Sequence, residues 1–97
     1  MKIYEKKYFE QKTTTEQKKL LCVTTYEEGE KNGKEKWFFK NGSLSKEIIY
    51  KKGVKEGIEK HYYKNKKIRC KIYYENGRMC YIKHYNDNEK NNKNNKK

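Results

Sequence analysis

Short runs of alternating apolar and polar residues along most of the chain predict β-strands. Segments 34–40 and 43–50 have strand length, are rich in aromatic and β-branched residues, and flank Asn41-Gly42. Asn-Gly between two such runs is typical of a two-residue type I′ turn, in which both central residues have positive φ. We therefore expect a β-hairpin about this turn. The expected cross-strand pairs are Trp37 with Lys46, Lys36 with Glu47, and Phe39 with Leu44.

The hairpin belongs to a sequence repeat with a period of 24. Tyr26, Tyr50 and Tyr74 are each followed three positions later by a glycine, and other positions keep the same spacing. A period of this length predicts an array in which each unit packs on its neighbours. The repeat positions are Tyr26, Gly29, Gly33, Trp37, Phe39, Asn41, Gly42, Leu44, Ile48, Tyr50, Gly53, Gly57, Tyr63, Ile68, Ile72, Tyr74 and Gly77.

The second copy predicts a hairpin of the same kind, with a weaker turn at Asn65-Lys66, where the glycine is missing. Its expected pairs are Tyr63 with Ile68, Tyr62 with Arg69, and His61 with Cys70. The recurring glycines are expected between strands, where turn geometry accounts for them. In the third copy Tyr81 stands where a second glycine is expected, so the sequence leaves open whether a last hairpin forms.

These units predict an all-β fold, a single-layer antiparallel meander of about six to eight strands in one elongated, twisted sheet. Residues 1–85 would form the repeat domain, with central copies at about 26–49 and 50–73 and degraded copies at both ends. Segment 3–11 is expected to add an edge strand. Segment 86–97, which is almost entirely Asn and Lys, is expected to be a disordered tail.

Composition changes this picture in two ways. The chain has 97 residues, and this length excludes a multi-domain enzyme. Its net charge of +13 suggests an acidic partner or surface. Its aromatic content of 14% is more than disordered chains usually carry, so the charge does not indicate disorder. A single-layer meander needs no deep core, which suits an apolar content of 32%.

Two central segments resemble a known repeat family. Residues 37–44 and 50–57 are similar to the MORN-repeat variant, whose units pair an aromatic-aromatic-Glu-Asn-Gly-Lys-Leu stretch with Tyr-x-x-Gly-x-x-x-Gly. Small bacterial proteins of this variant are commonly described as YwqK-type antitoxin or immunity components paired with a toxin. The resemblance therefore implies a protein that binds and neutralises a partner toxin and has no active site.

One face of the expected sheet combines aromatic rings with positive charge, and it is our candidate for partner binding. The candidate residues are Phe38, Tyr62, Arg69, Tyr73, Lys36, Lys60 and Lys71. Such a face could cover an acidic protein, such as a toxin. It could also bind nucleic acid without sequence preference, or an anionic membrane. Exposed sheet edges further suggest a homodimer.

We expect no enzymatic activity, cofactor or metal. A nucleophilic cysteine beside a base can be imagined at Cys70 with His61, or at Cys80 with His84, but the sequence supplies no orienting third group. The same four residues match no recognised zinc spacing. Three cysteines without a CxxC pair favour reduced thiols and a cytoplasmic location. The chain shows no apolar run long enough to span a bilayer and no secretory signal at residues 1–9.

Overall fold

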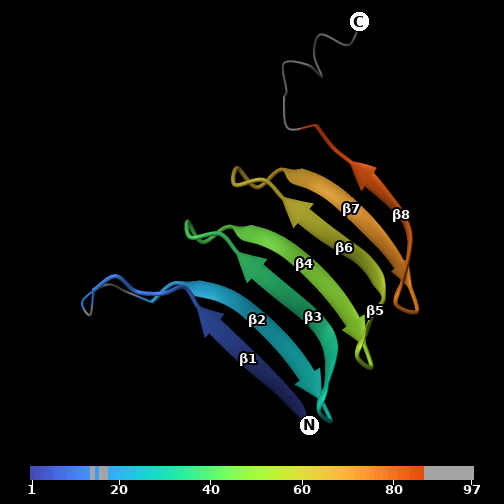
Figure 1. The fold of residues 1–97 in the computed structure, drawn as a ribbon, viewed down its shortest axis with the longest axis horizontal. Coiled ribbons are helices and arrows are strands. Elements are labelled where there is room, and N and C mark those ends of the chain that lie inside the picture. The colour runs from blue at the N-terminus through green and yellow to red at the C-terminus, as the bar shows by residue number, and fades with distance from the viewer. Residues whose placement is uncertain (14, 16–17, 87–97) are drawn as a thin grey trace, which may run out of the picture.

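The protein forms one open antiparallel sheet in the computed structural model, which describes residues 1–13, 15 and 18–86. The strands follow one another across the sheet in the order β1-β2-β3-β4-β6-β7-β8, and the short β5 pairs with β4 (Figure 1). The strands are β1 (Lys2–Tyr8), β2 (Leu20–Glu27), β3 (Glu30–Phe38), β4 (Leu44–Lys51), β5 (Val54–Lys55), β6 (Gly57–Tyr62), β7 (Ile68–Glu75) and β8 (Arg78–His84).

The sheet is a single thin layer, as the sequence predicted. Its extents are 52 × 42 × 15 Å, and the curved strands lie side by side in chain order without a second layer (Figure 1). Each strand therefore packs mainly on its two neighbours, which is the energetic pattern of a repeat array. The all-β meander of hairpins is confirmed.

Three tight turns join the repeats, and all are built alike. Glu28-Gly29, Lys52-Gly53 and Asn76-Gly77 each combine two positive φ values, between 49° and 87°. Two successive positive φ values are what a two-residue type I′ turn requires, and glycine takes the second position at no steric cost. The last of these turns connects β7 to β8, so the third hairpin forms although Tyr81 replaces the second glycine.

The prediction of a type I′ turn at Asn41-Gly42 is wrong. Gly42 has a φ of 91°, whereas Asn41 does not have a positive φ. Phe39 N donates to Ser43 O at 2.8 Å, and Gly42 N donates to Phe39 O at 2.9 Å. These bonds describe a three-residue loop with glycine in the left-handed position, the next most common hairpin connection.

The longer loop shifts the expected register at the end of the hairpin. Trp37 faces Lys46 and Lys36 faces Glu47 as predicted, but Leu44 faces Phe38 rather than Phe39. The second copy repeats the shift, because His61 faces Cys70 as predicted while Ile68 faces Tyr62. The expected pairs Phe39 with Leu44, Tyr63 with Ile68, and Tyr62 with Arg69 are therefore wrong. A bulge next to each loop absorbs one residue and displaces these partners.

Two glycines lie within strands and not between them, contrary to expectation. Gly33 lies inside β3 with a φ of 109°, and Gly57 begins β6 with a φ of 86°. The register of β2 against β3 shifts at this point, so that Thr24 faces Glu35 while Tyr26 faces Lys31. The glycine thus permits a bulge that draws the two halves of β3 closer together.

The turns at Lys52-Gly53 and Asn76-Gly77 are each joined to the preceding repeat by a main-chain hydrogen bond. Gly53 N donates to Lys31 O, and Gly77 N donates to Lys55 O, both at 2.8 Å. Side chains at equivalent positions of the two repeats add a second bond, because Lys52 N donates to Asn32 Oδ1 and Asn76 N donates to Glu56 Oε1, again at 2.8 Å. Neighbouring repeats are therefore joined by the same pair of contacts.

The two ends of the sheet are its exposed strands. The expected N-terminal edge strand is present as β1, which ends at Tyr8, and every residue of β1 and of β8 is exposed. Asn86 follows β8 and is exposed, and residues 87–97 of the expected tail lie outside the described part of the chain. Within residues 1–13, 15 and 18–86, no helix is long and apolar enough to cross a bilayer.

Candidate binding face

The strand register sorts the side chains onto two faces. Directly paired residues of antiparallel strands share a face, and successive residues of a strand alternate. One face, here called the packed face, holds the residues that are hidden from solvent. It carries Cys22, Thr24, Glu35, Trp37, Ile48, Glu59, His61, Cys70 and Ile72.

A buried carboxylate organises the packed face of the first repeat. Glu35 is only 3% exposed. Its Oε2 accepts a hydrogen bond from Thr24 Oγ1 at 2.8 Å and lies 3.1 Å from Lys31 Nζ, while Oε1 accepts one from Trp37 Nε1 at 3.1 Å. Lys31 also lies over the ring of Tyr50, with its Nζ 4.8 Å from the centroid. Every oxygen of the carboxylate has a donor, as a buried charge requires.

This environment holds the carboxylate in its ionised form. Burial alone would raise the pKa of Glu35, but the hydrogen bonds from Trp37, Thr24 and Lys31, together with the charge of Lys31, outweigh it and lower the pKa. Burial likewise opposes the charge of Lys31, yet the hydrogen bond and charge of Glu35 raise its pKa. Glu35 and Lys31 are thus both charged at neutral pH, and their ion pair has a structural role in the packed face.

The second repeat contains the same arrangement with two changes. Glu59, 5% exposed, pairs with Lys55 Nζ at 2.9 Å and with His61 Nε2 at 2.7 Å, and Lys55 lies over the ring of Tyr74. His61 replaces the tryptophan of the first repeat. Ile48 occupies the place of Thr24, so this carboxylate receives no hydroxyl donor from that position. The pKa of Glu59 is lowered, because hydrogen bonds from Lys55 and His61 outweigh the effect of burial.

The opposite face, here called the basic face, carries a row of lysines across the strands. Lys36 faces Glu47, Glu47 faces Lys60, Lys60 faces Lys71, and Lys71 faces Lys83. Strands in a sheet are spaced by about 4.8 Å, so these side chains leave the backbone at regular intervals across the sheet. The ammonium groups of Lys71 and Lys83 both lie over the ring of Tyr85, with Nζ 5.8 and 5.4 Å from its centroid. Glu47 is the one acidic member of this line, and its side chain is 14% exposed.

Aromatic rings border this row on both sides. Tyr73 and Tyr81 lie in the neighbouring row, with ring centroids 4.3 Å apart. Phe38 and Tyr62 lie on the other side of the row, and both are half-buried. Burial raises the pKa of the Tyr62 hydroxyl, the charge of Glu47 adds to the rise, and Lys71 opposes it. Tyr62 therefore stays neutral while it lies among charged neighbours.

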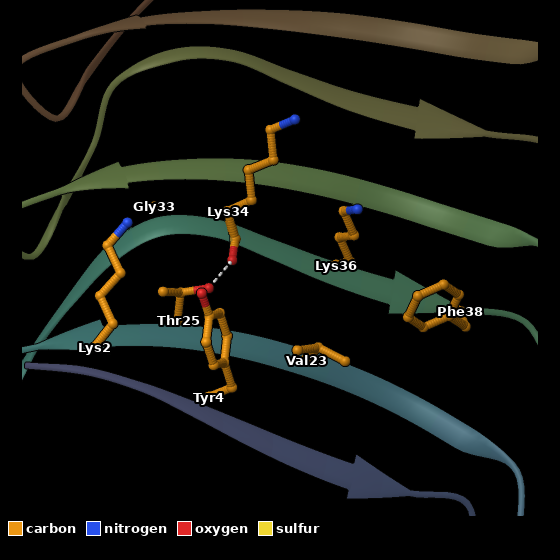
Figure 2. A pocket seen from close by; sticks show the side chains of 8 residues that line it. All are labelled: Lys2, Tyr4, Val23, Thr25, Gly33, Lys34, Lys36 and Phe38. Atoms are coloured by element: carbon orange, nitrogen blue, oxygen red, sulfur yellow. Dashed lines mark hydrogen bonds between the residues drawn. The ribbon is translucent and has the colours of Figure 1, made fainter.

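The basic face is hollowed over β1, β2 and β3. Figure 2 shows Val23 and Thr25 in the floor of this hollow, Tyr4 and Phe38 at its sides, and Lys36 beside the open centre. The volume is about 550 Å³, and none of the residues that line it is acidic. Thr25 Oγ1 is occupied by a hydrogen bond to Lys34 O at 3.0 Å, so lysine ammonium groups and aromatic rings are what the hollow offers a ligand. Its lining is Lys2, Tyr4, Val23, Thr25, Gly33, Lys34, Lys36 and Phe38.

The structure brings together all seven residues that the sequence nominated for partner binding. The register places Phe38, Tyr62, Tyr73, Lys36, Lys60 and Lys71 on the basic face, and Arg69, which the bulge leaves unpaired in the register, falls there by alternation from Cys70. Sequence reasoning missed Glu35 and Glu59 on the other face. Their signal was present, because Lys31 and Lys55, like Glu35 and Glu59, occupy equivalent positions of the two central repeats. Tyr4, Lys34 and Lys83 were also missed.

The cysteines and histidines do not assemble into a ligand cluster. His61, Cys70 and His84 lie in one cross-strand row of the packed face. However, His61 Nε2 is bound to Glu59, and Cys80 is exposed with its Sγ directed to Arg78 O. Among the described residues, no group of three or more His, Cys, Asp and Glu side chains could hold a metal ion. All three cysteines are free thiols.

Comparisons with family models, with curated proteins and with solved structures found no match to this chain.

Proposed function

We propose that the chain is a non-enzymatic protein-binding module that covers an acidic surface of a partner protein with its basic face. The observation that carries this proposal is the line of Lys36, Lys60, Lys71 and Lys83 bordered by Tyr62 and Tyr73. Aromatic anchors surrounded by charge are typical of protein interfaces, where rings supply buried area and charges set orientation and association rate.

The composition of the face argues against sequence-specific binding of nucleic acid. Only Arg69 and Arg78 are arginines among 26 basic residues, although bidentate phosphate and base contacts prefer arginine. Glu47 interrupts the lysine line and lies 3.7 Å from Lys34 Nζ, so its carboxylate lowers the positive charge that this part of the face presents to a phosphate backbone. Binding to nucleic acid or to an anionic membrane is therefore the alternative hypothesis.

The most concrete version of the proposal is an antitoxin or immunity protein in the cytoplasm. It rests on the resemblance of residues 37–44 and 50–57 to the MORN-repeat variant and on the presence of three free thiols. An acidic toxin bound to the basic face would be neutralised, because the surface with which it acts would be covered.

Co-expression with the protein encoded beside this one tests the proposal. The tagged chain is expected to capture that protein and to relieve its toxicity. A variant with Lys36→Glu, Lys60→Glu and Lys71→Glu should lose both effects, because it reverses the charge of the lysine line. The matched control carries the same charge change in the exposed turns, as Lys52→Glu, Lys64→Glu and Lys66→Glu, and should keep both.

Two outcomes would overturn the proposal. Capture that survives reversal of the lysine line would mean that another surface binds. A neighbouring protein that is neither toxic nor captured, together with salt-sensitive binding of oligouridine RNA or phosphatidylserine vesicles by the wild type alone, would assign the face to an anionic polymer or membrane.

A further inference from the structure

Both edge strands of the sheet expose large apolar side chains, with Ile3, Tyr4 and Tyr8 on β1 and a second set on β8. Met79, Tyr81 and Ile82 of β8 are 59%, 54% and 41% exposed. Ile82 faces Ile72 and Tyr81 faces Tyr73 on β7. The residues on β7 are half-buried, whereas their partners on β8 are exposed. An edge strand with large apolar side chains and unpaired main-chain groups is a template for another strand.

The main chain of β8 shows which groups are free to pair. Tyr85 N donates inward to Arg69 O at 2.8 Å. The N–H and C=O groups of one residue in an antiparallel strand point the same way, and successive residues alternate. Residues 82 and 84 therefore direct their N–H and C=O groups away from β7, out of the edge.

We propose that two copies of the chain pair through β8, antiparallel, about a two-fold axis at Ile82. The pairing joins two sheets into one. In this register Ile82 faces Ile82 of the second copy in a hydrogen-bonded pair, and Tyr81 faces Lys83 in each direction. The apolar side chains meet at the centre, and each ammonium group lies beside an aromatic ring, which is a favourable cross-strand pair.

Neighbouring registers are less favourable. An axis at Lys83 would bring two lysines face to face in a non-hydrogen-bonded pair, where side chains are closest. An axis at Tyr81 would run into the bulge at Cys80, where the pairing of β8 with β7 shifts from Tyr81 to Met79. The axis at Ile82 brings no two lysines together, and Tyr81, Ile82 and Lys83 pair regularly before the bulge at Cys80 is reached.

The other edge strand, β1, exposes Ile3 and Tyr4 to a similar degree, but its charges oppose most of its registers. An axis at Ile3 would pair Ile3 with Ile3, but only Lys2, Ile3 and Tyr4 of β1 could take part because the strand begins at Lys2. Axes at Tyr4, Glu5 or Lys6 would place Lys2 opposite Lys6, Glu5 opposite Glu5, or Lys6 opposite Lys6. Like charges directly opposite each other destabilise a strand pair, and charged edge residues are a common protection against pairing. The proposal therefore assigns the association to β8.

The sequence after β8 favours a second copy as the occupant. The residues one repeat beyond Ile68 and Ile72 are Asn92 and Lys96, so the apolar pattern of β4 and β7 does not recur there. β8 of a second copy supplies that apolar pattern through Ile82 and Tyr81. Because the two-fold axis is perpendicular to the sheet, both basic faces would lie on the same side and form one extended surface.

Light scattering during gel filtration tests the association. The wild type is expected at twice the chain mass of 11.9 kDa, with dissociation only on dilution. Ile82→Lys should give a monomer, because it places two lysines on the axis. Ile3→Lys, the matched substitution on the exposed residue of the opposite edge, should remain dimeric. Circular dichroism of both variants separates dissociation from unfolding.

Disulfide trapping gives a second measurement that does not depend on losing the dimer. A hydrogen-bonded antiparallel pair has a Cα separation of about 5.5 Å, which suits a disulfide. Ile82→Cys with Cys80→Ser should form a cross-linked dimer under mild oxidation, whereas Ile3→Cys with Cys80→Ser should not. A monomeric wild type, or cross-linking through position 3 instead of position 82, would overturn the proposal.

Discussion

Lys31 and Glu35 form an ion pair of 3.1 Å on the packed face, although four residues along a regular strand would separate their Cα atoms by about 13 Å. The bulge at Gly33 shortens that distance, because three residues of β3 face a single residue of β2. Glycine is needed there because φ is 109°. The same spacing recurs in the next repeat in Lys55 and Glu59, at 2.9 Å.

Removing the charge of Glu35 is expected to destabilise the fold. In Glu35→Gln, an amide would face the donors of Lys31 and Trp37, leaving buried polar groups without partners. Because Lys31 is 36% exposed and can turn toward water, we expect a loss of about 1 to 3 kcal/mol in the free energy of unfolding. Urea denaturation measures it. The control Glu75→Gln, on an exposed carboxylate, should change stability by less than about 0.5 kcal/mol, and equal effects would contradict the prediction.

Stability is expected to fall with acid. Since the folded chain lowers the pKa of Glu35 and Glu59, the unfolded chain takes up protons first, near the ordinary glutamate pKa of about 4.3. The contribution is therefore fully present above about pH 5 and is lost as the pH falls through the lowered values. Melting temperatures between pH 7 and pH 3 measure this loss. In Glu35→Gln with Glu59→Gln the slope should be shallower, and an unchanged slope would mean that other carboxylates cause it.

Lys66 occupies a backbone position that suits glycine. Its φ is 78°, and it is the counterpart of Gly42, with φ 91°, in the loop of the preceding repeat. A residue with a Cβ costs about 1 to 2 kcal/mol in this conformation. Lys66→Gly should therefore stabilise the protein by about 1 kcal/mol, measured by thermal or urea unfolding. Lys64→Gly is the matched control in the same loop, where φ is not positive, and it should be neutral or destabilising. Equal effects of the two substitutions would rule out backbone strain as the cause.

Much of the fold follows from local signals in the sequence. The repeat period, the strand-length runs and the glycines at positions 29, 53 and 77 predicted the meander and its connecting turns, because strand alternation and positive φ are local properties. The same alternation placed Phe38, Tyr62 and Tyr73 on one face. The row of Lys36, Lys60 and Lys71 could be anticipated for the same reason.

Prediction from the sequence failed for features of the backbone that depend on contacts between strands. Asn41-Gly42 suits either a two-residue or a three-residue loop, and the ladder between β3 and β4 selects the longer one. The glycines at positions 33 and 57 look like turn residues, but pairing with the preceding strand makes them bulges.

The chain by itself therefore determined the repeat, the strands and the face on which most of the positive charge lies. The tertiary structure alone decided that Glu35 and Glu59 are buried and ionised, because the lysine partners reach them across the bulges and the hydroxyl of Thr24 reaches Glu35 across the strand ladder. It also decided which strands remain at the edges with free main-chain groups. Side-chain alternation is a property of consecutive residues, whereas burial and edge exposure depend on which strands become neighbours.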